Sequence, residues 1–213
     1  NPLKDVEALH PLWLGALDHH QIRANYQPRE EAGFPKYLVP CTPKAIMYMI
    51  DHFDLPIFDE KREKGKRVVI VNYSPIIGAP LFQMVRNRRG TGGVYDIDAA
   101  KADLEEAVAS ADILVVAAGK PGLIHGNQIK PGAAVFDLGW NVLEDDSVVG
   151  DIDYDSVMEK AAYVVPFKRG VGPVTTTMVM LNLTYLHKLQ DYFRRGGEDP
   201  VLVPFAKDIG LCA

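Results

Sequence analysis

Ile70-Val71-Asn72-Tyr73-Ser74-Pro75-Ile76-Ile77-Gly78-Ala79-Pro80 closes an apolar run that starts at Val68, and it predicts a strand that turns directly into a helix. The first N–H groups of such a helix lack backbone partners and carry the positive end of its dipole, so they can hold phosphate oxygens. Ser74 adds a hydroxyl, and Gly78 lets the backbone approach closely. The full G-x-G-x-x-G fingerprint is absent. Taken alone, the stretch fits a dinucleotide's pyrophosphate site and a buried strand with a surface turn about equally.

Composition sets the outer limits of the interpretation. The 213 residues are 47% hydrophobic and 24% charged, which suits one large or two small domains with a real core. No apolar run approaches the ~18 residues that span a bilayer, and the first residues resemble neither a signal nor a transit peptide. We therefore expect a cytoplasmic protein with no membrane partner. The formal charge of −5 argues against a nucleic-acid partner.

The cysteines and histidines indicate neither disulfides nor metal sites. Cys41 and Cys212 are too few for a disulfide framework, so we expect free thiols. The six histidines are scattered without metal-ligand spacing, and we predict no metal. Cys41 lies just before an expected helix, where a lowered pKa would make it a nucleophile, although inert packing is the commoner role of a buried cysteine.

Helices and strands are expected to alternate from residue 38 onward. The first expected helix has Thr42 as its N-cap, and the later ones cover 81–87, 103–109, 154–161 and 175–193. The expected strands cover 68–71, 94–98, 113–117, 133–137 and 163–165. Residues 90–93 are expected to end the helix before them. This alternation indicates a parallel sheet covered by helices. The predicted fold class is therefore α/β, with a doubly wound, Rossmann-like NAD-binding domain.

Asp98 is the predicted selector of the cofactor. It ends the second expected strand ~20 residues after Gly78, where a dinucleotide fold places the acid that binds the adenosine ribose. A carboxylate there accepts a hydrogen bond from the 2′-OH of NAD but repels the 2′-phosphate of NADP, so NAD is favoured. Asp96 shares its face and is the rival candidate. A solvated or helix-capping aspartate is the structural alternative.

Three further turns are candidate ligand sites. Gly119 follows one central strand and Trp140 the next, at the strand ends where the nicotinamide half would lie. An ordinary tight turn would look the same. Residues 168–175 combine two cations, two glycines and a proline, which suits either a ligand-binding loop or the punctuation before a helix.

Several stretches together carry a family resemblance. They are, in chain order, Lys4-Asp5-Val6-Glu7, Pro40-Cys41-Thr42-Pro43, residues 73–80, Gly150-Asp151-Ile152-Asp153 and residues 170–175. As a set, spanning about residues 2–189, they resemble the methylenetetrahydrofolate dehydrogenase/cyclohydrolase family. Residues 94–98, the Lys4 to Glu7 stretch and the long insertion before Pro40 are most similar to its monofunctional NAD-dependent, yeast-type branch.

The resemblance implies a division of the chain. Residues 1–37 would end a folate-binding domain, residues 38–166 would form the NAD-binding domain, and residues 167–213 would form a folate loop and a helix returning to the folate-binding domain. The chain would thus hold remnants of a second α/β domain. The family's catalytic lysine and its tyrosine partner precede the first residue here, so we expect either a piece of a longer protein or a chain that lacks them.

The resemblance also assigns roles to individual residues. Tyr73 replaces an arginine beside the phosphates and Ala99 replaces a serine of NADP-using members, and both changes favour NAD. Glu7 takes the place of a folate-contacting aspartate, and Lys168 with Arg169 replaces a Pro-Gly of the folate loop. The remaining assignments are Gly172 and Pro173 as folate-loop residues and Cys41 as a catalytic residue at the interdomain cleft.

The expected activity is NAD-dependent oxidation of methylenetetrahydrofolate to the methenyl form. Hydride leaves a carbon flanked by two nitrogens, so positioning against the nicotinamide supplies much of the catalysis. Hydrolysis of the product needs a positioned base and acid, which this chain does not show, so we expect no cyclohydrolase activity. The family resemblance implies a homodimer. The alternatives are a shikimate-dehydrogenase-like oxidoreductase and a non-catalytic dinucleotide-binding module.

Overall fold

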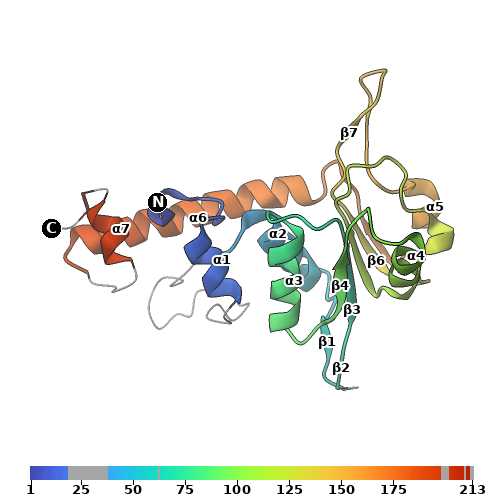
Figure 1. Ribbon diagram of the computed structural model, residues 1–213, viewed down its shortest axis with the longest axis horizontal. Helices are drawn as coiled ribbons and strands as arrows, with labels where there is room; N and C mark the ends of the chain where they lie inside the picture. The colour runs from blue at the N-terminus through green and yellow to red at the C-terminus, as the bar shows by residue number, and fades with distance from the viewer. Residues whose placement is uncertain (19–37, 62, 198–201, 209, 212–213) are drawn as a thin grey trace.

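The computed structural model describes residues 1–18, 38–61, 63–197, 202–208 and 210–211. The molecule is elongated, with a sheet and its helices at one end and one long helix leading away toward both chain termini (Figure 1). Most of the insertion before Pro40, two of the six histidines (His19 and His20) and Cys212 lie outside the described residues.

Helices and strands alternate through most of the described chain. The helical elements are η1 (Pro2–Lys4), α1 (Pro11–Asp18), α2 (Cys41–His52), α3 (Gly78–Asn87), α4 (Lys101–Ser110), η2 (Gly126–Gln128), α5 (Tyr154–Met158), α6 (Val171–Arg194) and α7 (Val203–Lys207). The strands are β1 (Phe58–Asp59), β2 (Lys64–Gly65), β3 (Arg67–Val71), β4 (Thr91–Tyr95), β5 (Ile113–Val116), β6 (Ala134–Asp137), β7 (Asn141–Val142), β8 (Val148–Val149) and β9 (Tyr163–Val165).

The central sheet has five parallel strands in the order β4-β3-β5-β6-β9. From β3 the chain steps to β4 on one side, and it then crosses back to form β5 on the other side of β3. The carboxyl ends of β3 and β5 therefore face a topological switch point, the place where open α/β sheets bind ligands. The predicted doubly wound α/β fold is confirmed.

Successive residues of each central strand enter opposite hydrophobic layers. Val68 and Ile70 of β3 pack with α2, α3 and the first part of α6, whereas Val69 and Val71 pack with α4 and α5. Burying each such side chain contributes about 1.5–3 kcal/mol. Continuous apolar strands of this kind are typical of a parallel sheet covered on both faces.

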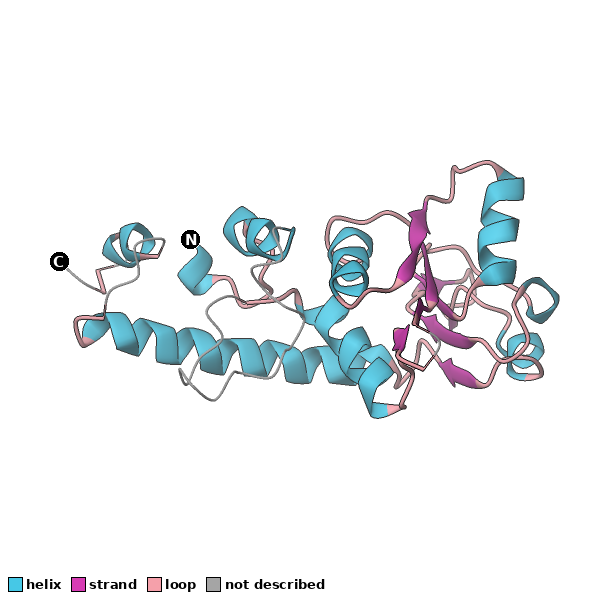
Figure 2. Cartoon of the chain, turned by 90° about the horizontal axis from the view of Figure 1, so that it is seen from below, coloured by secondary structure: helices cyan, strands magenta, loops and turns pink. Residues whose placement is uncertain are grey.

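A third hydrophobic cluster lies away from the sheet, along the distal half of α6 (Figure 2). Trp13 of α1 and Leu3 of η1 pack there with Leu186 and Phe193 of α6, and α7 covers the end. Residues 1–18 and the described residues beyond 170 form helices and no strand. The predicted domain boundaries and the α/β character of a second domain stay predictions.

The second sheet strand begins and ends earlier than expected. β4 covers Thr91–Tyr95 rather than 94–98, because the glycines read as a helix end pair with β3 instead. Gly92 has a φ of +118°, and a Cβ there would lie 1.9 Å from the carbonyl oxygen of Val68. Only glycine permits this approach, and both candidate acids, Asp96 and Asp98, consequently follow the strand.

Several helix ends also differ from the expectation. α2 begins at Cys41 with Pro40 as N-cap, so the predicted Thr42 cap is wrong. α3 and α6 begin three and four residues earlier than expected, and α5 ends at Met158 rather than at residue 161. The expected loop over residues 168–175 is therefore partly helix, with Gly170 as N-cap. These first turns lack a side-chain cap that would mark them in the sequence.

Replacing Gly78 by alanine should destabilise the fold by about 1–3 kcal/mol. A Cβ at Gly78 would lie 2.6 Å from the Asn72 carbonyl oxygen and would push α3 away from β3, whereas a Cβ at Gly172, also in a first helical turn, meets nothing within 4 Å. Gly172→Ala is the matched control and should be neutral or slightly stabilising. Denaturant unfolding followed by circular dichroism measures both, and equal effects would contradict the packing argument.

Candidate functional site

Asn72 ties three strand ends together at the switch point. Its N–H donates to the carbonyl of Tyr95 and its Nδ2 donates to the carbonyl of Ala117, each at 2.7 Å. Its φ is +91°, a left-handed conformation that asparagine tolerates better than most residues. Asn72 thus serves where a dinucleotide fingerprint has glycine. This role of Asn72 was not predicted from the sequence, where an asparagine directly after a buried strand was the signal for it.

The turn after β3 offers a small set of donors to an anion. Ser74 Oγ accepts from the N–H of Ile76 at 3.2 Å, which leaves its hydroxyl hydrogen for a ligand. The Ala79 N–H is taken by the Ser74 carbonyl at 2.9 Å, and Pro80 has no N–H. Among the described residues, no acceptor meets the N–H groups of Ile77 and Gly78. Tyr73 stands beside them, 60% exposed.

Both candidate acids lie exposed at the carboxyl end of β4, beside this turn. The Asp96 carboxylate accepts from the N–H of Asp98 at 3.5 Å, and the Asp96 carbonyl accepts from the N–H of Ala99. Asp96 therefore helps to shape the turn that presents Asp98 to solvent. The structure brings Asp98 and Ala99 to the same sheet edge as Ser74 and Gly78.

The ends of β5 and β6 complete this edge. Gly119 follows β5 with a φ of +64°. Trp140 follows β6, is 65% exposed, and its ring meets Phe167 edge-on at 6.3 Å. Both predicted nicotinamide-side residues thus lie on the edge that Asn72 organises, while their role in binding stays a prediction.

Two buried carboxylates lie beneath this edge, and neither was assigned a role from the sequence, although Asp151 belongs to the stretch 150–153 that carries the family resemblance. Asp151, fully buried, accepts four hydrogen bonds, and Asp137, 2% exposed, accepts from the N–H groups of Gly139, Asp151 and Ile152. Burial raises the pKa of Asp137, and these N–H donors partly oppose the shift. An aspartate closing an apolar strand was the signal for Asp137.

A second polar cluster joins the N-terminal segment, α2 and α6. Asn182 Nδ2 lies 2.9 Å from the Val6 carbonyl, 3.1 Å from the Val39 carbonyl and 3.2 Å from Cys41 Sγ. Lys44 Nζ donates to Asn182 Oδ1 at 3.0 Å, and the Cys41 thiol donates to the Val6 carbonyl at 3.3 Å. Polar residues on the apolar faces of α2 and α6 were the sequence signal for Lys44 and Asn182.

The surroundings of Cys41 do not produce a thiolate. Burial raises the pKa of Cys41 to about 11, and the nearby Lys44 ammonium only partly offsets this effect. Burial also lowers the pKa of Lys44 to about 8. A lowered thiol pKa, the less common of the two possibilities for Cys41, is therefore not found, because the loss of hydration outweighs the attraction of the Lys44 ammonium. At neutral pH Cys41 is a thiol, which can donate a hydrogen bond but is a weak nucleophile.

The predicted folate residues fall into two places. Glu7 is exposed and follows Val6, so it lies beside Cys41. Gly172 and Pro173 are exposed in the first turn of α6, at the carboxyl edge of the sheet. Ten residues of helix separate Gly172 from Asn182, about 15 Å along the axis. The structure thus brings Glu7 and Cys41 together and places Gly172 and Pro173 nearer the carboxyl edge of the sheet.

Lys168 and Arg169 precede this helix and are both exposed. Lys168 Nζ lies 5.4 Å from the ring centre of Phe167. Arg169 has a φ of +60°, a conformation that favours glycine. Arg169 thus holds a backbone conformation that glycine adopts readily, at the position where the family resemblance placed the glycine of a Pro-Gly.

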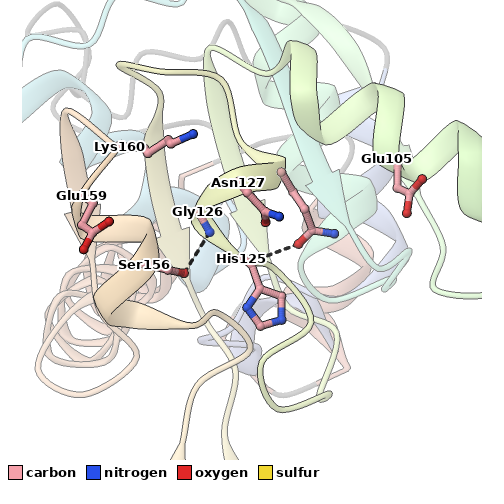
Figure 3. Close-up of a pocket in the computed structure, with 8 residues that line it drawn as sticks. Glu105, His125, Gly126, Asn127, Ser156, Glu159 and Lys160 are labelled. Atoms are coloured by element: carbon pink, nitrogen blue, oxygen red, sulfur yellow. Dashed lines mark hydrogen bonds between the residues drawn. The ribbon is translucent and has the colours of Figure 1, made fainter.

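An open groove of about 620 Å³ lies between α4, η2 and α5 (Figure 3). Its lining residues are Glu105, His125, Gly126, Asn127, Gln128, Ser156, Glu159 and Lys160. Glu105 and Glu159 stand on opposite sides and point away from each other (Figure 3). None of the sequence-predicted site residues lines this groove, and its charged groups do not converge on one point.

Among the residues that the structure describes, no three histidines, cysteines or acids cluster closely enough to hold a metal ion. None of the helices in that part of the chain combines the length and apolarity needed to cross a bilayer.

Comparison with known proteins gives a consistent picture. Residues 40–191 match the family model of the tetrahydrofolate dehydrogenase/cyclohydrolase NAD(P)-binding domain. The bifunctional protein FolD of Thermodesulfovibrio yellowstonii is 37% identical over 190 residues, 89% of this chain and 59% of that protein. The methylenetetrahydrofolate dehydrogenase-cyclohydrolase of Trypanosoma brucei, solved with NADP and an inhibitor, superposes with a TM-score of 0.75 at 34% identity over 88% of this chain and 59% of that one.

A more distant likeness concerns the yeast-type branch. The NAD-dependent 5,10-methylenetetrahydrofolate dehydrogenase of Saccharomyces cerevisiae superposes with a TM-score of 0.65 at 23% identity, covering 89% of this chain and 63% of that one. At this identity the likeness supports the fold alone. The chain spans 54–60% of the length of the curated relatives compared with it.

The buried Lys44 should make stability rise with pH between 8 and 9. Its pKa is about 8 in the folded protein and near 10.5 ordinarily, so the unfolded chain binds more protons in this range and unfolding becomes less favourable as pH rises. Cys41 acts in the opposite direction as the pH approaches and passes 9, because its folded pKa of about 11 exceeds its ordinary 9.0. Lys44 alone contributes about 1 kcal/mol from pH 8 to 9, and the opposing thiol leaves a net gain of about 0.5 kcal/mol.

Denaturant titrations at both pH values measure this gain. Lys44→Met should abolish it, whereas Lys188→Met, at an exposed position of α6, should leave it unchanged. A Lys44→Met protein with the same pH dependence as the wild type would show that Lys44 is not the responsible group.

Proposed function

Because this chain belongs to the tetrahydrofolate dehydrogenase/cyclohydrolase family, we propose that it serves the NAD-dependent oxidation of methylenetetrahydrofolate to methenyltetrahydrofolate. The observation that carries the cofactor half is the pair of exposed carboxylates, Asp96 and Asp98, directly after β4. A 2′-phosphate at this edge would meet both negative charges, whereas ribose hydroxyls would donate to them. We place the chain in the yeast-type, NAD-using branch on this basis.

The proposed dinucleotide lies across the switch point. Its pyrophosphate is held by the N–H groups of Ile77 and Gly78 and by the Ser74 hydroxyl, which the fold leaves available. Its adenosine ribose meets Asp98 on the β4 side, with Tyr73 and Ala99 adding no cation for a further phosphate. Its nicotinamide half lies on the β5 and β6 side. The NADP complex of the Trypanosoma brucei enzyme describes that protein and does not decide the cofactor here.

The proposed folate site extends from the first turn of α6 toward Glu7 and Cys41. Hydride transfer needs the methylene carbon held against the nicotinamide, and the adjacent nitrogens stabilise the cation that forms. Cys41 would contribute contact or a hydrogen bond, because its raised pKa keeps it protonated. Residues 1–37 and 167–213 would belong to the folate-binding domain, as the family resemblance implies.

We also propose that cyclohydrolase activity is absent and that the protein forms a homodimer through its nucleotide-binding part. Water attack on the methenyl product requires a base and an acid facing it. In the described cluster around Cys41, Lys44 is 3% exposed and donates to Asn182, so it does not face a substrate.

The shikimate-dehydrogenase and non-catalytic alternatives are not favoured, since the matching family model is that of the folate enzymes.

Cofactor choice is the sharpest test of this proposal. In titration calorimetry we expect NAD to bind and NADP to bind more weakly, and Asp98→Ser should shift the NAD-to-NADP preference about tenfold toward NADP by removing a like charge. Asp103→Ser, an equally exposed change in the first turn of α4, is the control and should not alter it. Wild-type binding of NADP as tight as that of NAD would overturn the cofactor assignment.

The reaction itself is tested by its products. With methylenetetrahydrofolate and NAD, we expect NADH and methenyltetrahydrofolate to form in equal amounts, followed by absorbance. Methenyltetrahydrofolate added alone should decay no faster than in buffer. Enzyme-dependent conversion to the formyl compound would contradict the proposed absence of cyclohydrolase activity.

A further inference from the structure

Asp151 occupies a pocket of backbone donors directly behind the end of β5. Its Oδ2 accepts from the N–H groups of Ala118 and Gly119 at 2.5 and 3.0 Å, and its Oδ1 accepts from the N–H of Lys120 at 2.9 Å and from Asn141 Nδ2 at 2.8 Å. Four donors fill the lone pairs of one fully buried carboxylate. Three consecutive N–H groups that would otherwise suit a phosphate are thus already occupied by the protein.

This arrangement fixes where the opposite sides of the same peptide groups point. In a trans peptide the carbonyl of one residue points away from the N–H of the next. Since the N–H groups of residues 118–120 all point at Asp151, the carbonyls of Ala117, Ala118 and Gly119 point away from it. The Ala117 carbonyl meets Asn72 Nδ2 at the switch point, which shows the direction that this side faces.

We infer that Asp151 is a positioning residue that holds the turn 118–120 so that the carbonyls of Ala118 and Gly119 face the nicotinamide, where they accept the N–H groups of its carboxamide. The inference rests on the proposed function, because it requires a nicotinamide dinucleotide at this edge. A carboxamide offers two N–H donors, whereas a carboxylate at the same place would face only acceptors. The site therefore selects the amide form of the ring.

The surroundings of Asp151 permit little adjustment. A Cβ at Gly139 would lie 2.4 Å from the Asp151 carboxyl group, and a Cβ at Gly150 would lie 1.8 Å from Asp137 Oδ2. Asp151→Asn keeps the size of the side chain, but one of its two terminal atoms becomes an NH2 group that faces backbone N–H donors, either those of Ala118 and Gly119 or that of Lys120. Because a donor cannot satisfy these donors, part of the turn loses its acceptor, and we expect its carbonyls to move.

Calorimetric titration of the whole chain with three ligands tests the inference. The ligands are NAD, its nicotinic acid analogue (deamido-NAD) and ADP-ribose, which lacks the ring. In the wild type we expect NAD to bind about tenfold more tightly than deamido-NAD. In Asp151→Asn we expect ADP-ribose affinity to stay within twofold of wild type and NAD affinity to fall to that of ADP-ribose. Asp153→Asn, at a partly exposed aspartate two residues later that pairs with His125, should behave as wild type.

The outcomes separate this inference from the proposed function. If the wild type binds neither NAD nor ADP-ribose, the proposed function fails. If it binds NAD and deamido-NAD equally, or if Asp151→Asn weakens all three ligands by the same factor, the positioning role is overturned and Asp151 is purely structural. Should Asp151→Asn fail to fold, the wild-type comparison of NAD with deamido-NAD still decides whether the carbonyls read the amide.

Discussion

Buried polar groups at the carboxyl edge of the sheet must find partners inside the protein, and this requirement shapes the nucleotide-binding part. Where a parallel strand ends, its chain turns away and its last peptide groups lose their neighbours. Here side chains replace the lost neighbours. Asn72 joins the ends of three strands by hydrogen bonds, while Asp137 and Asp151 accept hydrogen bonds from the N–H groups of the following turns. A protein that satisfies these groups internally presents an ordered, polar rim even before a ligand arrives.

Polar groups at the junction between α2, α6 and the N-terminal segment are also paired inside the protein, but here an ammonium and a thiol lose their hydration. Asn182 satisfies two backbone carbonyls and orients Lys44 and Cys41. Burial of an ammonium costs several kcal/mol, and its lowered pKa reflects that cost. The same burial raises the pKa of the thiol. Both shifts favour the neutral forms, but at pH 7 only the thiol is neutral, and Lys44, whose pKa is still above 7, keeps its charge with Asn182 Oδ1 as its acceptor.

Much of the fold was predictable from the sequence, because apolar runs such as 113–117 mark buried strands whatever their neighbours are. The ends of helices and strands were less predictable. Gly92 and Gly93 have the local sequence of a helix end, and only their pairing with β3 makes them part of a strand. Site residues at strand ends, such as Gly119, could be placed from topology. Asn182 and Asp151 could not, because their importance comes from contacts with segments far away in the chain.

One helix belongs to both hydrophobic regions. α6 has 24 residues and is about 36 Å long, and it contributes Val171 and Met178 to the sheet's core and Phe193 to the distal cluster. A continuous helix transmits rotation along its axis instead of absorbing it. Because the first half of α6 is itself fixed in the sheet's core beside α2, the distal cluster is carried on a helix that is anchored at its base, and its position follows that of α2 and the sheet.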